Sequence, residues 1–346
     1  MAMVTLATSL IASVVAAPEA AVDYGEFAVS QLRCVIGNNA ARGEHGAGYN
    51  GIFSLRSSDL DVSPFVPAYA GLNLEHYFDA RVQHAERAIF FEPRCAPMFF
   101  TRINDTTAEL HQPTSPFYGV ESWTRFELKD PYYVDMTFRC IPHKTGLEGG
   151  CLGVFWASYI NAPLDKSVYF LSAGSTLDKP QWVQYCTQVH GRDSTVCAES
   201  DASSIPFAGG GGSLFSSISP LRYSAPFFYG RFRDKVLIYI FEPNPHVRFS
   251  HSPSGGGATP SGDAQNPAWD FQFIIPDYQV DMEYGMKMRL VYKPWVDRAD
   301  VLNEARKYAN KTIADTNHKL GEMRAFRDKH PLDGFTIREM RDEGRQ

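Results

Sequence analysis

The sequence has few of the features that identify membrane or nucleic-acid-binding proteins. Beyond residue 22, no stretch approaches the ~18 uninterrupted apolar residues of a membrane-spanning helix. Basic residues occur only as scattered pairs and the formal charge is −6, whereas phosphate binding needs clustered Lys and Arg. Since 44% of the residues are apolar and 13% aromatic, disorder is excluded for most of the chain. We expect a folded protein without nucleic-acid partners or membrane insertion.

Several catalytic motifs are also missing. The chain has no Gly-x-Ser-x-Gly elbow, no His-Glu-x-x-His zinc motif and no Cys-x-x-Cys. Two glycine clusters, 209–212 and 255–257, lack the Gly-Lys-Ser/Thr ending of a phosphate-binding loop. Both clusters are predicted to lie in tightly turning surface loops close to the functional site. No cofactor or metal is predicted. A structural calcium ion in an Asp/Asn-rich loop is left as an alternative, and no segment has the spacing of an EF-hand.

The N-terminus and the cysteines bear on the compartment. Residues 1–22 resemble a secretory signal that lacks a basic start, which predicts a secreted or periplasmic protein; a disordered N-terminus is the alternative. Two cysteine pairs repeat a spacing of eleven, and the first pair brackets a predicted hairpin. If the protein is exported, we expect two local disulfides; if it is not, we expect buried free thiols. The six cysteines are Cys34, Cys95, Cys140, Cys151, Cys186 and Cys197.

What is present is a long succession of short apolar and aromatic runs between Pro, Gly, Asn and Asp, from about residue 49 to 292. Such runs are typical of antiparallel strands. In residues 134–140, apolar and polar side chains alternate, which predicts a half-buried strand. The chain is therefore predicted to be all-β, with a large antiparallel sandwich over residues 23–296. The clearest strands are predicted at 88–92, 96–103, 107–111, 124–128, 132–140, 152–159, 167–171, 235–241, 271–275 and 285–292.

The chain changes character after residue 296. Residues 297–346 hold 11 Lys and Arg against 10 Asp and Glu, so this part has a charge of +1 and the rest −7. Leu302, Ala305, Ala309, Ile313 and Leu320 recur at helical spacing. They predict an amphipathic helix of about 25 residues, capped by Asp297 or Asp300. Packing against the sandwich or against another copy of the chain would bury its apolar stripe, so a homo-oligomer through this helix is one predicted arrangement.

Several segments combine polar and aromatic side chains in a way that suits sugars. Hydroxyl groups need bidentate polar partners, and the apolar faces of a sugar ring stack on aromatic rings. Residues 43–51 offer an acid, an imidazole, a phenol and an amide among glycines. The alternative for each segment is a structural turn or core packing. The predicted substrate-binding residues are Glu44, His45, Tyr49, Asn50, Glu92, Arg94, Trp123, Trp156, Tyr159, Asn161, His251, Trp269 and Asp270.

Acids at strand ends are the predicted catalytic groups. Partial desolvation there raises a carboxyl pKa toward the range useful for general acid catalysis, and glycoside cleavage commonly needs two carboxyls. Glu121 opens one strand, and Glu242 ends the most hydrophobic strand of the chain. We predict these two as the acid and base, with His76 or His190 assisting. By strand alternation His76 lies on the more apolar face, opposite Glu75, where a hydrogen-bonded core histidine is the alternative.

The last strands resemble a known family. The segments 269–276 and 284–292, with the succession of strands before them, are similar in layout to galactose-mutarotase-like β-supersandwich domains over roughly 240 residues. The epimerases of that family carry an Asn-His-x-Tyr segment, whereas here two residues separate Asn73 from His76. The resemblance implies a sheet face that binds a carbohydrate.

These observations predict a secreted carbohydrate-active protein that cleaves a glycosidic bond as a glycoside hydrolase or a polysaccharide lyase. The alternatives are a sugar epimerase and a non-catalytic glycan-binding protein, because fold similarity does not choose among them.

Overall fold

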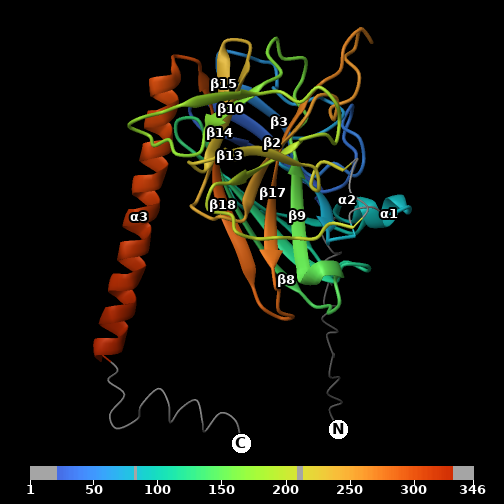
Figure 1. The fold of residues 1–346 in the computed structure, drawn as a ribbon. Helices are drawn as coiled ribbons and strands as arrows, with labels where there is room; N and C mark the ends of the chain where they lie inside the picture. The colour runs from blue at the N-terminus through green and yellow to red at the C-terminus, as the bar shows by residue number, and fades with distance from the viewer. Residues whose placement is uncertain (1–21, 82–83, 209–212, 330–346) are drawn as a thin grey trace, which may run out of the picture.

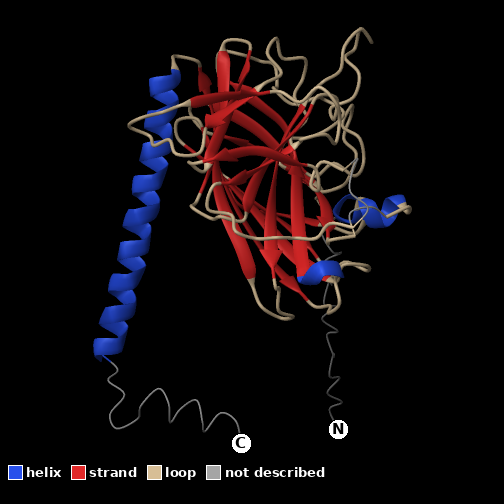
Figure 2. Ribbon diagram, viewed as in Figure 1, coloured by secondary structure: helices blue, strands red, loops and turns tan. Residues whose placement is uncertain are grey.

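The computed structural model describes residues 22–81, 84–208 and 213–329. These residues form three sheets and a long C-terminal helix (Figures 1 and 2). The first sheet has the order β1-β2-β3, the second β11-β10-β14-β15-β18-β8-β7-β6-β5, and the third β13-β12-β16-β17-β9-β4. Neighbouring strands are antiparallel except for the parallel pair β12 and β13. The all-β prediction is confirmed.

The strands of the first and third sheets are β1 (Tyr24–Ala28), β2 (Leu32–Gly37), β3 (Gly51–Ser57), β4 (Asn73–Phe78), β9 (Cys151–Ala157), β12 (Thr195–Ala198), β13 (Ile218–Tyr223), β16 (Val247–Ser252) and β17 (Ala268–Pro276). Those of the second sheet are β5 (Phe99–Asn104), β6 (Thr107–Gln112), β7 (Val120–Lys129), β8 (Tyr133–Pro142), β10 (Val168–Leu171), β11 (Trp182–Tyr185), β14 (Phe227–Phe232), β15 (Lys235–Phe241) and β18 (Tyr284–Pro294). The helical segments are α1 (Arg87–Phe90), α2 (Glu92–Cys95), the 3-10 turn η1 (Glu148–Gly150) and α3 (Arg298–Lys329).

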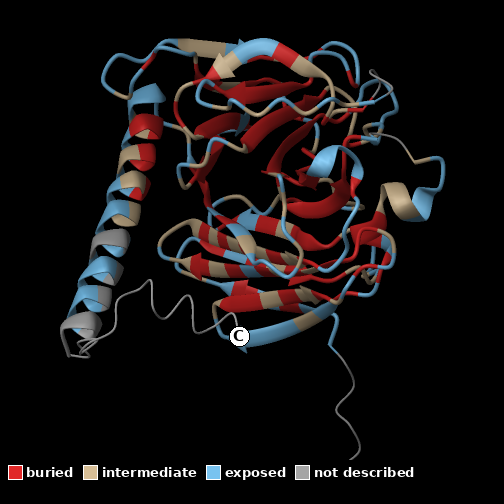
Figure 3. Ribbon diagram, turned by 60° about the horizontal axis from the view of Figure 1, so that its bottom comes forward, coloured by how far each residue is buried: buried red, intermediate tan, exposed pale blue. Residues whose placement is uncertain are grey.

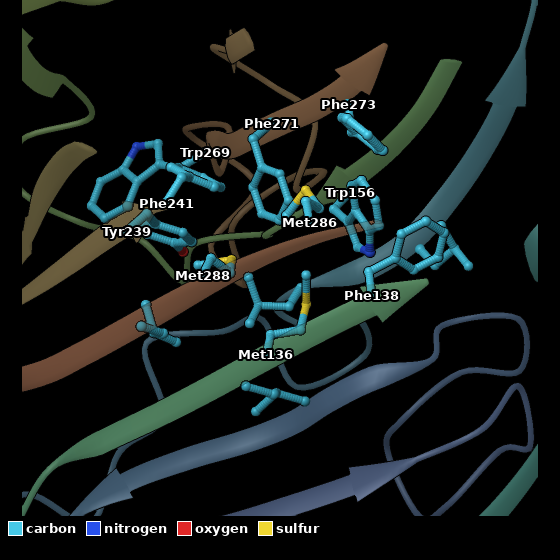
Figure 4. Close-up of a cluster of buried hydrophobic side chains, with 14 of the residues drawn as sticks. Met136, Phe138, Trp156, Tyr239, Phe241, Trp269, Phe271, Phe273, Met286 and Met288 are labelled. Atoms are coloured by element: carbon cyan, nitrogen blue, oxygen red, sulfur yellow. The ribbon is translucent and has the colours of Figure 1, made fainter. Parts of the chain in front are cut away.

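The six-stranded and nine-stranded sheets pack face to face. In β8 the predicted alternation is observed, with every second residue buried. Phe138 of β8 meets Trp156 of β9 edge to face at 4.8 Å between ring centroids, and Phe241 of β15 meets Phe271 of β17 at 5.0 Å (Figure 4). Such aromatic pairs add to the free energy gained from burying their area. The core of the protein therefore lies between these two sheets.

The C-terminal helix is confirmed, but it is longer and less covered than predicted. Asp297 caps it by accepting the Asp300 backbone N–H at 2.8 Å. Only the first turns pack against the nine-stranded sheet, and the rest of α3 stands clear of the strands (Figures 1 and 3). The predicted stripe is therefore only partly buried, because Ile313 and Leu320 are exposed. No helix among the described residues has the length and apolarity needed to cross a membrane.

Two local predictions are wrong. Residues 88–92 were expected to be a strand, yet they belong to α1 and α2, where Pro93 occupies an early helical position. Cys140 and Cys151 were expected to face each other across a hairpin. They lie in β8 and β9, which belong to different sheets. All six cysteines are free thiols, so neither predicted disulfide is present. The predicted signal-like segment lies outside the described residues.

Candidate functional site

A pocket of about 250 Å³ opens on the outer face of the six-stranded sheet, away from the core. Strands β4, β9 and β17 form its floor, while loops and the short helices α1 and α2 form its walls. Aromatic rings surround a small number of charged groups. The lining residues are Tyr49, Tyr69, Glu75, His76, Arg87, Phe90, Phe91, Arg94, Phe155, Ala157, Tyr159, His190, Ser213, Leu214, Phe215, Gly255, Ala268 and Asp270.

A β-bulge in β4 places the two polar residues Glu75 and His76 on the pocket side. The register of β4 against β9 shifts between Leu74 and His76, and a bulge gives one strand an extra residue. Leu74 and Tyr77 consequently both pack in the core between the sheets. Strict alternation predicted Glu75 and His76 on opposite faces, which the bulge corrects. Glu75 was missed as a site residue for this reason.

Glu75 is a buried carboxylate with three partners. Arg94 Nη1 donates to its Oε1 at 3.0 Å, the Tyr159 hydroxyl donates to the same oxygen, and His76 Nε2 lies 3.4 Å from Oε2. Burial alone would raise the pKa of Glu75, but the charge and hydrogen bond of His76, with Arg94 and Tyr159, hold that pKa at about 2. Glu75 is therefore ionised across the neutral pH range.

Arg94 orders this wall of the pocket. Besides Glu75, its Nε donates to the Gly48 carbonyl at 2.7 Å. Its guanidinium lies 3.8 Å from the ring centre of Tyr49 and 4.7 Å from that of Phe91. A planar guanidinium can combine ion pairing and stacking in this way. Arg94 thus connects the glycine-rich segment 43–51 to β4.

Asp270 supplies a second carboxyl in a different state. It is fully buried in β17, and its Oδ1 accepts the Ser158 backbone N–H at 3.1 Å. Its Oδ2 has no hydrogen-bond partner among the described residues. Burial raises the pKa of Asp270 well above its usual value, and the negative charge of Glu75 raises it further. Asp270 therefore lines the pocket with an unsatisfied oxygen, and its burial favours the protonated form of the carboxyl.

His76 and His190 both line the pocket and differ in their partners. His76 Nδ1 contacts the Phe90 carbonyl, so this nitrogen carries a proton. His190 is exposed, and its Nδ1 lies 2.9 Å from Ser252 Oγ. Burial lowers the pKa of His190, against the opposing charge of Glu75. His190 is therefore the neutral imidazole of the pocket at pH 7 and can accept a proton.

The pocket brings together six of the seventeen predicted site residues: His76, His190, Tyr49, Arg94, Tyr159 and Asp270. Sequence reasoning missed Glu75, Tyr69, Arg87, Phe90, Phe91 and Phe215. The adjacent acid and histidine, Glu75 and His76, were a sequence feature that could have indicated the site. The run at 90 and 91 was interpreted as a strand. The predicted loop at 255–257 does reach the pocket through Gly255, and residues 209–212 lie outside the described residues.

The structure does not bring Glu121 and Glu242 together. Glu121 lies on β7 and bonds His111 at 2.8 Å and His143 at 3.3 Å. Glu242 follows β15 and lies 3.5 Å from Lys287. Strands β18 and β8 separate β15 from β7 in the sheet. Neither acid lines the pocket, because both belong to the nine-stranded sheet on the other side of the core.

Four predicted binding residues are buried as parts of the core or of the loop framework. Trp156 and Trp269 are fully buried between the sheets (Figure 4), where no sugar ring can reach them. Glu92 accepts the backbone N–H groups of Phe117 and Tyr118. The Asn50 amide bonds Asn39 and the backbone of Leu74.

His251 is likewise structural. Its ring contacts Thr187 Oγ1 at 2.7 Å and the Lys166 carbonyl at 2.9 Å, and burial lowers its pKa to about 4. Trp123 stacks on His111 outside the pocket. Glu44, His45 and Asn161 line a separate groove. Among the described residues, no group of three or more His, Cys, Asp or Glu side chains is arranged to hold a metal ion.

We expect the low pKa of Glu75 to appear in the stability of the protein. An unfolded Glu titrates near 4.3, about two units above the folded value, and each unit corresponds to about 1.4 kcal/mol. A lowered carboxyl pKa stabilises the fold above the unfolded pKa, and this contribution of roughly 3 kcal/mol is lost as pH falls toward 2. Urea unfolding of the wild type and Glu75→Gln between pH 7 and pH 2.5 would measure it. An identical pH dependence in both proteins would contradict the assignment.

Fold and site together define an antiparallel β-sandwich protein with a charged, aromatic-lined pocket on the outer face of one sheet. No family model and no curated protein matches the chain. Solved structures that resemble it include a putative aldose 1-epimerase from Escherichia coli K12, with a TM-score of 0.46, 10% identity and coverage of 79% of this chain and 99% of that one.

Two further solved structures are similar at the same level. A galactose mutarotase-like protein from Lactobacillus casei has a TM-score of 0.42 and 7% identity, over 78% of this chain and 100% of that one. A heparan sulfate lyase HepC mutant from Pedobacter heparinus has a TM-score of 0.41 and 12% identity, and the match covers 80% of this chain and 36% of that one. The mutarotase-like layout predicted from the last strands thus recurs among these structures.

Proposed function

We propose that the protein is carbohydrate-active and that its pocket binds one sugar ring and transfers protons at it, as a sugar epimerase does. The observation that carries this proposal is that one aromatic-lined pocket holds two titratable groups whose pKa values burial shifts in opposite directions, upward for Asp270 and downward for His190. Environments that push the pKa values of two titratable groups apart assign the acid and the base. Asp270 is the acid and His190 the base.

The size of the pocket favours a single ring over a chain. Its volume of about 250 Å³ lies just below the range of roughly 300–1,000 Å³ that is usual for ligand pockets. The rings of Tyr49, Tyr69 and Tyr159 form a contiguous cluster, with centroids 4.6–5.6 Å apart. Such rings can stack on the apolar face of a sugar, while Arg94 and Glu75 are held by one another.

The proposed reaction interconverts the two anomers of an aldose. His190 removes the proton of the anomeric hydroxyl, the bond between the anomeric carbon and the ring oxygen breaks, and Asp270 donates its proton to that ring oxygen. Rotation of the open-chain aldehyde and reversal of the same transfers close the ring on the other face. Glu75 has too low a pKa to act as an efficient base, because general bases work best near the operating pH. It instead holds His76 and Arg94.

Anomer exchange of hexoses, pentoses and their derivatives, followed by proton NMR, tests this proposal. We expect exchange faster than in buffer, and a loss of about 100-fold or more in His190→Gln and in Asp270→Asn, since general acid–base groups contribute typically 10²–10⁴-fold. Glu121→Gln and Glu242→Gln are matched controls outside the pocket and should keep full activity. Full activity in both pocket variants would contradict the proposal.

The same preparation distinguishes the other functions. Newly released reducing ends from oligosaccharides would instead support glycosidic cleavage, and their loss in Glu121→Gln and Glu242→Gln would assign that reaction to the acids predicted from sequence. Saturable sugar binding without any chemical change would support a glycan-binding protein. The buried, fully partnered state of Glu75 is the observation that favours this second candidate, because a rigid ion pair positions a ligand without reacting.

A further inference from the structure

A groove that contains three arginines and three acids lies on the outer face of the three-stranded sheet, separate from the Glu75 pocket. Two hollows of about 400 and 570 Å³ adjoin there, because they share Arg42, Ser54, Arg56 and Asp61. The first hollow also contains Arg33 of β2, and the second continues to Glu44, His45 and Asn161. Three of the residues predicted to bind sugar, Glu44, His45 and Asn161, thus line this groove.

Two arginines face each other across the sheet in this groove. Arg33 of β2 and Arg56 of β3 are register partners, so their side chains leave the same face with Cβ atoms about 5 Å apart. Like charges directly opposite one another destabilise a sheet. Arg56 is balanced by Asp61 at 3.0 Å. Arg33 is exposed and has no charged or hydrogen-bonding side-chain partner among residues 22–81, 84–208 and 213–329.

A third arginine completes the groove. Arg42 pairs with Glu26 at 2.7 Å, and its guanidinium lies 4.3 Å from the ring centre of Tyr24. These contacts hold Arg42 at the edge of the hollow that contains Arg33. Of the three guanidinium groups in this concave surface, those of Arg42 and Arg56 are therefore ion-paired, and that of Arg33 is left for a ligand.

We propose that this groove binds a ligand carrying an oxyanion, a carboxylate, sulfate or phosphate, held between Arg33 and Arg56 with Arg42 beside it. Guanidinium groups bind such oxyanions through paired N–H donors. The bound anion also removes the repulsion between the two opposed arginines. The oxyanion belongs either to an anionic sugar that continues along the groove toward Asn161 or to a free inorganic anion.

Titration of the full chain with sodium sulfate, phosphate, glucuronate and glucose tests the site. Ionic strength is held constant with chloride, since screening weakens exposed charge interactions. We expect saturable binding of the three anions and none of glucose in the groove, followed by the arginine Nε–H signals in NMR. Glucuronate binding more tightly than sulfate would assign the site to an anionic sugar, and equal binding would assign it to the free oxyanion.

Variants separate a site from general charge attraction. Arg33→Gln should weaken anion binding about tenfold, because a hydrogen bond to a charged group contributes roughly that factor. Arg125→Gln is the matched control: Arg125 is also exposed and pairs with one carboxylate, Glu109, on the nine-stranded sheet. Without anion, Arg33→Gln should leave Tm unchanged or higher. At one sulfate concentration, the wild type and Arg125→Gln should gain more Tm than Arg33→Gln.

The absence of saturable binding for every anion would overturn the proposal, and so would equal weakening in Arg33→Gln and Arg125→Gln. Binding here should persist in Asp270→Asn, so the outcome is independent of whether the pocket is an epimerase site.

Discussion

Replacing Arg94 by Met is expected to lower the free energy of unfolding by about 3–5 kcal/mol at pH 7, because breaking a buried ion pair is strongly destabilising and Glu75 would keep only Tyr159 and His76 as partners. Arg94 is 8% exposed and Glu75 is 7% exposed, so water cannot replace the lost partner. The variant also loses the bond to the Gly48 carbonyl and the stacking on Tyr49. Urea denaturation monitored by Trp fluorescence measures the change.

A double variant distinguishes the charge from the packing. In Arg94→Met with Glu75→Gln, no unpaired charge remains, and a buried ion pair replaced by neutral groups is often close to neutral in stability. We therefore expect the double variant to recover much of the loss. Arg125→Met removes an exposed pair with Glu109 and should cost less than about 1 kcal/mol. Equal losses in Arg94→Met and Arg125→Met would refute the importance of the buried pair.

The second large effect is expected where α3 meets the nine-stranded sheet. Glu304 is 2% exposed and bonds Lys293 of β18 at 3.1 Å and the Tyr133 hydroxyl at 3.0 Å. Burial alone would raise the pKa of Glu304, but its lysine and tyrosine partners lower it, so the group is ionised. Glu304→Ala leaves Lys293 with Asp300 as its remaining carboxylate. We expect a loss of about 3–5 kcal/mol, as for other broken buried pairs.

Limited proteolysis of α3 provides a local readout for the same variant. If Glu304 anchors the helix, cleavage within residues 298–329 should accelerate in Glu304→Ala before the sandwich is digested, because α3 packs only through its first turns. Lys307→Met removes a lysine that also bonds Glu304, at 3.0 Å, but is exposed. This control should change stability by less than about 1 kcal/mol and leave the cleavage rate unchanged.

Strands with a strong local signal were predictable. Residues 235–241 were predicted with the bounds that β15 has, because a continuous apolar run flanked by turn residues leaves few alternatives. Residues 88–92 have a similar composition and form no strand. There Pro93 lacks the N–H that a strand ladder requires, and the Glu92 carboxylate is occupied by backbone donors of a distant loop.

Six of the eighteen pocket residues followed from residue type, and the rest depended on contacts distant in sequence. His76 and Arg94 were chosen as polar groups in or beside apolar runs, and His190 and Asp270 as polar groups of expected loops. Their convergence required β4, β17 and the loop before β12 to meet on one face, which local sequence does not encode. Glu121 and Glu242 were chosen because they lie at strand ends. Those strands, β7 and β15, belong to the nine-stranded sheet and not to the sheet that carries the pocket.

The sequence by itself determined an all-β sandwich with a charged C-terminal helix, since alternation and helical periodicity are local patterns set by which face of each element is buried. Only the tertiary structure decided where the chemistry lies. The bulge between Leu74 and His76 turned Glu75 to the pocket side, and no composition or spacing announces an extra residue in a ladder. The pKa values followed from the same assembly: burial beside Glu75 raises the pKa of Asp270, whereas Arg94 and His76 keep Glu75 ionised.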